Sequence, residues 1–194
     1  MLHIHRAERA DGLVEALRAI LADPPADPFA PEVVAVPTRG MERWLAQRLS
    51  DRLGVCANVE FPSPRRLVGD AVATASGIDA ETDPWLPERS VWPLLEVVDG
   101  CLGESWLHPL AQHLNGTADT TRRARRFSTL RHLADLYDRY ALHRPAMVRA
   151  WAAGDDADGS WQAPLWRRLR TRIAVADPAE RVEGACPRLR EEPE

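Results

Sequence analysis

The sequence has 194 residues, of which 45% are hydrophobic and 28% are charged, so it can bury the core of one full domain or of two small ones. Its formal net charge of −4 at pH 7 argues against a general binder of polyanions. All 25 residues counted as Lys+Arg are arginine, and the absence of lysine excludes a Schiff-base enzyme and a nucleotide loop of the G-x-x-x-x-G-K-[ST] type for this chain acting alone.

The first part of the sequence predicts alternating strands and helices. Strands are expected over residues 2–5, 33–36 and 55–61, and helices over residues 13–21, 41–53 and 65–75. We expect the inward faces of the first two helices to hold Leu13, Leu17, Ile20, Leu21, Met41, Trp44, Leu45, Leu49 and Leu53. This order predicts an α/β fold with a partial, doubly wound parallel sheet.

After residue 76 the apolar residues follow a helical period, and no strand-like alternation is visible. Helices are expected over residues 90–102, 106–116, 127–142, 145–154 and 161–175. We therefore predict an α/β domain over residues 1–76, an all-α subdomain over residues 77–175 and a polar tail over residues 176–194. The polar end of the sequence suggests that the chain is the front piece of a longer protein.

The cysteines and the N-terminal residues indicate the cellular compartment of the protein. Cys56, Cys101 and Cys186 are scattered and odd in number, which favours free thiols in a reducing cytoplasm over a disulfide framework or a zinc site. The N-terminus is charged from the start and no run approaches 18 apolar residues, so neither secretion nor membrane insertion is expected.

The predicted turn between the first strand and the first helix, residues 5–13, lies where a phosphate-binding loop would be. Its only glycine is Gly12, and the bulky Arg6, Glu8 and Arg9 would keep a phosphate away from the backbone amides. We predict that this chain has lost nucleotide binding, and the sequence gives no catalytic residues, metal site or bound cofactor.

Arginines flank the turns after the second and third predicted strands. These residues are Arg39, Arg43, Arg48, Arg52, Arg65 and Arg66. A solvated surface is the ordinary explanation of such a group. Ligands bind at the carboxyl ends of parallel strands, however, and arginine suits bidentate phosphate contact, so a nucleic-acid site is an equally weighted alternative.

The predicted helix over residues 129–145 carries Arg131, Asp135 and Arg139 at intervals of four residues, with Asp138 beside them. An ion-pair ladder along the helix accounts for this spacing, at roughly 0.2–0.5 kcal/mol for each pair. Alternatively, the carboxylates contact the edges of nucleic-acid bases, because aspartate can accept a hydrogen bond from cytosine N4.

Five segments taken in order resemble the N-terminal region of the RecC family, the gamma subunits of exodeoxyribonuclease V. They are MLHIHRAERADGLVEALRAIL, DPFAPEVVAVPTRGMERWLAQRLS, GVCANVEFPSP, LADLYDRYALHRP and WQAPLWRRL. The resemblance runs from residue 1 to about residue 170 and implies a domain similar to a superfamily 1 helicase that has lost its ATPase machinery. The helical half resembles the helical subdomain inserted in such a domain.

The resemblance implies a non-catalytic DNA-channel subunit in the repair of double-strand breaks by homologous recombination. Such a subunit binds double-stranded DNA ends, receives the unwound 3′ single strand and scans it for the Chi recombination signal. Motor and nuclease activities, with their ATP and Mg²⁺, belong to RecB-like and RecD-like partner subunits of a heterotrimer. The positions that the resemblance places along the channel are Pro37, Arg39, Arg43, Ser63, Gly69, Asp135, Leu136, Asp138 and Arg144. Thr38, Arg65 and Arg66, which lie in the same two turns, complete the predicted DNA-binding residues.

Two further hypotheses stay open at the level of sequence. One is an active ATP-dependent helicase whose motifs lie beyond residue 194, although the missing lysine argues against it. The other is a protein scaffold whose arginines contact protein partners instead of DNA.

Overall fold

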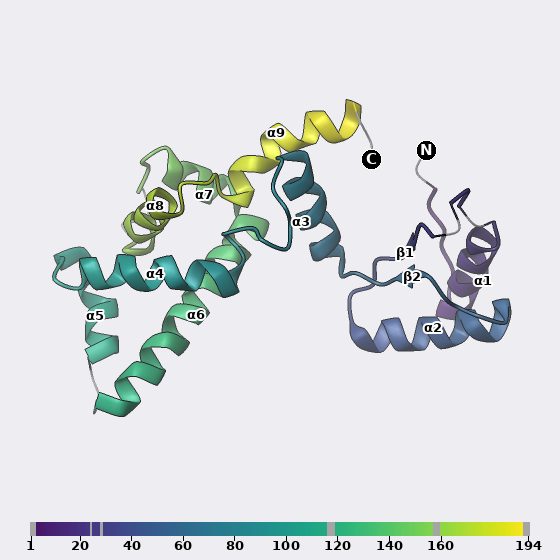
Figure 1. Ribbon diagram of the computed structural model, residues 1–194, viewed down its shortest axis with the longest axis horizontal. Helices are drawn as coiled ribbons and strands as arrows, with labels where there is room; N and C mark the ends of the chain where they lie inside the picture. The colour runs from purple at the N-terminus through teal and green to yellow at the C-terminus, as the bar shows by residue number, and fades with distance from the viewer. Residues whose placement is uncertain (1–2, 24, 28, 116–118, 157–159, 192–194) are drawn as a thin grey trace. The chain divides into compact units, whose positions relative to one another are not determined.

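The computed structural model describes residues 3–23, 25–27, 29–115, 119–156 and 160–191 (Figure 1). Within these residues the chain is mostly helical, with one parallel sheet of two strands. The chain divides into two units, Met1–Val68 and Gly69–Glu194. This division comes earlier in the chain than the boundary at residue 76 that the sequence predicts. Helix α3 (Pro64–Ala75) runs through the division, which is why composition alone does not locate it.

The sheet of the first unit pairs β1 (Glu32–Val33) with β2 (Val59–Glu60), and α2 (Arg39–Leu53) lies between them in the chain. Hydrogen bonds of 2.9 Å continue the pairing along the chain, because the amides of Glu32, Val34 and Val36 donate to the carbonyls of Asn58, Glu60 and Pro62. Parallel strands require such a crossover connection. The expected strands at 33–36 and 55–61 are therefore confirmed as a parallel pair, although each is shorter than predicted.

The strand expected at residues 2–5 is wrong for the described residues 3–5, which carry no strand. Ile4 is 72% exposed, so its side chain provides no buried apolar contact that could hold residues 3–5 in a sheet. A doubly wound sheet is thus not formed by the residues that the structure describes, and the observed architecture is a two-stranded parallel sheet with helices.

The core of the first unit forms where α1 (Ala10–Leu21) packs on α2. Its buried side chains are Val14, Val36, Leu45 and Leu49, and the side chains packed around them include Leu17, Leu21, Trp44 and Leu53. The predicted face of α1 is partly wrong, since Leu13 and Ile20 are exposed and Val14 takes the central place. In α2, Met41 is 40% exposed and Trp44 is half-buried, so the core begins one turn later than expected.

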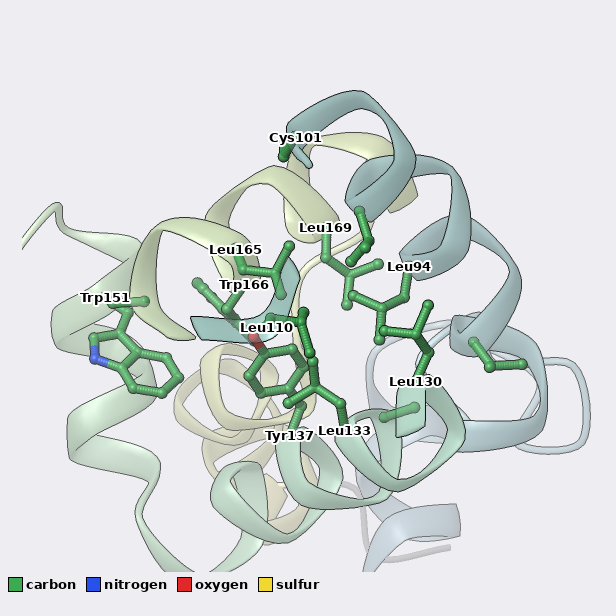
Figure 2. Packing of buried hydrophobic residues seen from close by; sticks show 14 of the residues in the cluster. Leu94, Cys101, Leu110, Leu130, Leu133, Tyr137, Trp151, Leu165, Trp166 and Leu169 are labelled. Carbon is green, nitrogen blue, oxygen red and sulfur yellow. The ribbon is translucent and has the colours of Figure 1, made fainter. Parts of the chain in front are cut away.

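The second unit contains helices at all five places where the sequence predicts them, which confirms the helical half. Their bounds are Pro87–Cys101 (α4), Ser105–Leu107 (η1), His108–Asn115 (α5), Asp119–His143 (α6), Pro145–Ala152 (α7) and Gln162–Ile173 (α8). Figure 2 shows the core between them, in which Leu94, Leu130, Leu165 and Trp166 are fully buried. Trp166 packs between Trp85 and Trp151, with ring centroids 5.9 and 6.2 Å away.

The sequence predicts a polar tail at residues 176–194. This expectation is corrected by the structure, which has a packed helix there, α9 (Pro178–Glu191). A capping box starts it: the Asp177 side chain accepts from the Ala179 amide at 2.8 Å, and Glu180 accepts from the Asp177 amide at 2.9 Å. Arg170 of α8 donates to both carboxylate oxygens of Glu180. The start of α9 is therefore bound to the end of α8.

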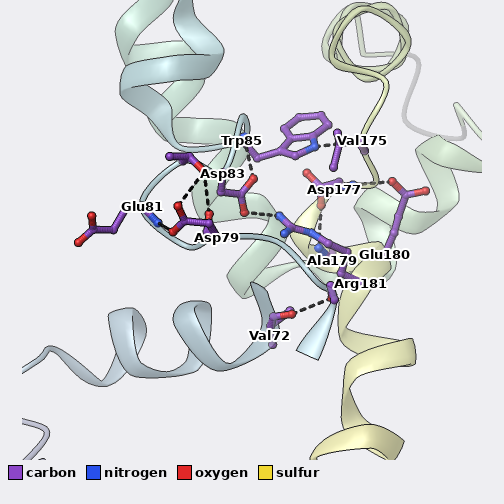
Figure 3. A network of polar contacts seen from close by, with 12 residues as sticks. Val72, Asp79, Glu81, Asp83, Trp85, Val175, Asp177, Ala179, Glu180 and Arg181 are labelled. Atoms are coloured by element: carbon purple, nitrogen blue, oxygen red, sulfur yellow. Dashed lines mark hydrogen bonds and ion pairs between the residues drawn. The ribbon is translucent and has the colours of Figure 1, made fainter. Parts of the chain in front are cut away.

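A buried ion pair joins α9 to the segment before α4 (Figure 3). Arg181 Nη2 lies 2.5 Å from Asp83 Oδ2, and the two side chains are 5% and 10% exposed. The other Asp83 oxygen accepts from the Trp85 amide at 3.0 Å, and the Trp85 indole donates to the Val175 carbonyl at 2.9 Å. An ion pair, hydrogen bonds and an aromatic ring thus hold together two segments that lie about 90 residues apart in the chain.

Breaking this ion pair should destabilise the protein strongly. Arg181→Met leaves the Asp83 carboxylate buried without its cation, so we expect a loss of about 3–5 kcal/mol in the free energy of unfolding, measured by urea denaturation. Arg172→Met is the matched control, because Arg172 pairs with Glu96 at 2.6 Å with both side chains more than half exposed. It should cost less than about 1 kcal/mol. Equal costs for the two substitutions would contradict the importance of the buried pair.

The stability should also depend on pH through Asp177. Burial raises the pKa of this carboxyl from 3.8 to about 7. Between these pH values the folded chain holds a proton that the unfolded chain has released. The contribution of Asp177 to the free energy of unfolding therefore falls as pH rises from about 4 to 7. The fall is up to about 1.4 kcal/mol per pH unit. Asp177→Asn keeps a helix cap but cannot titrate. The prediction fails if wild type and Asp177→Asn have parallel profiles of unfolding free energy from pH 4 to 8.

Candidate nucleic-acid interface

Parallel pairing brings the turns after β1 and β2 to the same edge of the sheet. The last hydrogen bond of the ladder, from the Val36 amide to the Pro62 carbonyl, comes directly before both turns. In each turn the chain continues into a helix, α2 after the first strand and α3 after the second. The carboxyl ends of parallel strands are the usual place for a ligand.

The two helices begin in the same way. In α2, Pro37 precedes Thr38, whose hydroxyl accepts from the Met41 amide at 3.2 Å. In α3, Ser63 accepts from the Arg66 amide at 3.2 Å, and Pro64 is the first helical residue. A hydroxyl cap satisfies one free backbone amide, and proline at the first position has no amide to leave unpaired. Both helix starts are therefore well defined without a bound ligand.

Arginines project from both helix starts. Arg39 and Arg43 on α2 are exposed, and neither makes an ion pair with the described residues. Arg48 and Arg52, farther along the same helix, lie instead within 4 Å of Asp11 or Glu15 on α1. The unpaired cations of α2 thus gather at the end of the helix that adjoins the sheet edge. This edge also carries the positive end of the helix dipole.

The start of α3 adds Arg65 and Arg66 to the same edge. Both are exposed, and each already has a contact within the chain. Seven predicted site residues are therefore brought together: Pro37, Thr38, Arg39, Arg43, Ser63, Arg65 and Arg66. Gly69 lies farther along α3, at the first position of the second unit. A side chain there would meet open space, so the backbone does not require glycine.

The remaining predicted residues lie on or just after α6. Asp135 and Asp138 share one face, and Asp135 lies 3.6 Å from Arg131, so the ion-pair ladder of the sequence is partly formed. Asp138 is half-buried and has its own contact within the chain. Leu136 points elsewhere, into a hollow of about 270 Å³ lined also by His113 and His132. Arg144 precedes α7, with its guanidinium 5.9 Å from the Tyr140 ring centroid.

One surface feature was missed by the sequence analysis. Trp92 of α4 and Phe127 of α6 are 59% and 42% exposed, and their rings lie against each other. The signal is visible in the sequence, because Val91, Leu94 and Val98 set the buried face of α4 and Trp92 falls outside that period. Hydrophobicity alone would place such a tryptophan in the core, so its position along the helix is what distinguishes it.

The described residues contain no group of three or more His, Cys, Asp or Glu side chains that could hold a metal ion. Nor does any helix among them have the length and apolar character of a membrane-spanning segment.

A family model described as the N-terminal domain of RecC matches residues 2–191. The chain belongs to the RecC family. Curated relatives named RecBCD enzyme subunit RecC include those of Mycobacterium tuberculosis H37Rv, at 44% identity, and Mycolicibacterium smegmatis, at 46%, each aligned with 99% of this chain. The RecC of Escherichia coli K12 is 28% identical over 87% of this chain. These alignments cover 19%, 18% and 15% of the relatives, so this RecC-family chain spans about a fifth of their length or less.

Proposed function

We propose that this chain is the DNA-channel part of a RecC subunit and that it binds the unwound 3′ single strand in a RecBCD-type enzyme of the cytoplasm. RecB-like and RecD-like subunits would be its partners, and the complex would act on double-stranded DNA ends in recombinational repair. The observation that carries this proposal is the gathering of Arg39, Arg43, Arg65 and Arg66 at one edge of the sheet. Membership of the RecC family supports it.

The chemistry of the sheet edge favours a nucleic-acid backbone as its ligand. Guanidinium groups bind phosphate oxygens in pairs, and Arg39 and Arg43 make no ion pair with the described carboxylates, unlike Arg48 and Arg52 farther along α2. Contacts of this kind hold a strand in register without selecting its sequence. Recognition of Chi would then depend on groups that meet base edges, and the Asp135 carboxylate, 42% exposed, is one such group.

The start of α1 supports a subunit without ATPase chemistry. A phosphate loop needs free backbone amides, but α1 begins after Arg9, and the Gly12 amide already donates to the Arg9 carbonyl at 3.1 Å. The side chains of Arg6, Glu8 and Arg9 are all exposed around it. We propose that the inactivated helicase-like domain keeps the strand-binding edge and leaves ATP and Mg²⁺ to its partners.

This proposal predicts that the chain does not bind ATP–Mg²⁺. Isothermal titration calorimetry should give no measurable heat of binding at micromolar protein. A micromolar site that disappears on mutation of residues 5–13 would instead favour the alternative of an active helicase.

The sheet edge is tested by Arg39→Ala together with Arg43→Ala in the assembled complex. We expect weaker retention of the 3′ strand of a forked DNA, and a salt dependence of log K that is shallower by roughly 0.7 for each phosphate group that the variant no longer binds. ATP hydrolysis by the partner subunits should be largely unchanged. Binding is measured by fluorescence anisotropy from about 50 to 200 mM salt.

The matched control is Arg48→Ala together with Arg52→Ala, which removes the same charge from the same helix. These arginines face Asp11 and Glu15, so their removal should leave the salt dependence almost unchanged. If the two double variants behave alike, the sheet edge is not the DNA site, and the arginines serve a protein scaffold.

A further inference from the structure

Trp92 and Phe127 form an exposed aromatic pair on the second unit. Their ring centroids lie 5.7 Å apart, with the ring planes inclined by 45°. Of the described residues in this unit, the only other large hydrophobic side chain with comparable exposure is Leu142, at 40%. Large exposed aromatic groups that gather at one place commonly mark a binding surface. We call Trp92 and Phe127 the aromatic platform.

Charged side chains surround the platform. Arg89 lies three residues before the tryptophan on α4, is exposed, and makes no ion pair with the described residues. Arg131, four residues after the phenylalanine on α6, lies 3.8 Å from Glu88 and 3.6 Å from Asp135. The Arg131 side chain is 37% exposed, so part of it is open to solvent. Arg89 is thus a cation without an ion pair among the described residues beside two accessible aromatic rings, whereas Arg131 is held by two carboxylates.

The platform continues into the proposed DNA-contacting face of α6. Phe127, Arg131 and Asp135 follow one another at intervals of four residues, so they share one side of the helix. At 1.5 Å per residue, Phe127 and Asp135 are separated by about 12 Å along the helix axis. A ligand that extends along this side of α6 can therefore meet an aromatic ring, a cation and a carboxylate in turn.

We propose that the aromatic platform stacks against unpaired bases of single-stranded DNA, with Arg89 beside it to contact phosphates. This inference rests on the proposed function, which places single-stranded DNA at Asp135. Every base has a π-face, so stacking on Trp or Phe binds a strand without selecting its sequence. A docking site for a protein helix would need a stripe of apolar side chains. Here charged groups flank two isolated rings, which favours a nucleic acid.

The test compares two ligands of equal charge with the full chain. Fluorescein-labelled oligothymidylate offers bases to stack, whereas an abasic oligonucleotide of the same length offers only the backbone. Trp92→Ala and Phe127→Ala should each weaken oligothymidylate binding about five-fold or more, and should leave binding of the abasic strand unchanged. Trp92→Phe should keep most of the affinity, because it keeps a ring.

Leu142→Ala is the matched control, since Leu142 lies on the same helix with an exposure of 40%, close to the 42% of Phe127. Leu142→Ala should change neither the affinity for oligothymidylate nor the affinity for the abasic oligonucleotide. Thermal unfolding of each variant establishes that it is folded. The proposal is overturned if folded Trp92→Ala and Phe127→Ala bind oligothymidylate like wild type, or if they lose affinity for both ligands equally. It is also overturned if they impair only association with partner subunits, which would make the platform a protein-docking surface.

Failure of the platform can be told apart from failure of the proposed function. If Arg39→Ala with Arg43→Ala weakens binding of both oligonucleotides while the platform variants bind normally, only the platform is wrong. If the wild-type chain binds neither oligonucleotide, the DNA-channel function of this chain and the platform are both refuted.

Discussion

The parallel pairing of two short strands is the constraint on which the proposed site depends. Parallel strands leave the sheet at the same edge, so the turns that follow them must lie together, whatever their sequences. The hydrogen bond from Val36 to Pro62 sets this register. Two hydroxyl-capped helices then begin from neighbouring points, each with arginine in its first turn. The arrangement concentrates positive charge locally in a chain whose net charge is negative.

The second unit relies on a different kind of contact. Its helices pack around leucine and tryptophan side chains, and three polar features add to the packing of α9: the Arg170–Glu180 contact, the Asp177 cap and the buried Asp83–Arg181 pair. Burying charge is costly, and a buried ion pair offsets that cost only with good geometry and further hydrogen bonds. The offset is partial here, because Asp83 also accepts from the Trp85 amide, but Arg181 Nε and Nη1 are buried without a hydrogen-bond partner among the described residues.

Local periodicity was sufficient to predict the parallel pair and the helices between residues 87 and 173. It failed where the outcome depends on distant residues. Residues 178–191 look like a polar tail because the charged Arg181 is buried by pairing with Asp83, which lies 98 positions away in the sequence. Ile4 alternates as in a strand but has no buried face, and Trp92 is hydrophobic but lies outside the buried period of its helix. The twelve predicted DNA-binding residues stay predictions.

The ion pair between Asp83 and Arg181 also constrains how the protein is made. It joins residues 98 positions apart, and closing so long a loop costs conformational entropy before the ion pair can form. On the ribosome, Asp83 and Trp85 emerge well before Arg181 and Val175, and at about 5–20 residues per second the wait is roughly 5–20 s. During this interval α4 and α6 can pair and Trp85 gains Trp166 once α8 has been made, but Asp83 still lacks Arg181. The nascent chain therefore carries Asp83 without its cation until the start of α9 has been made.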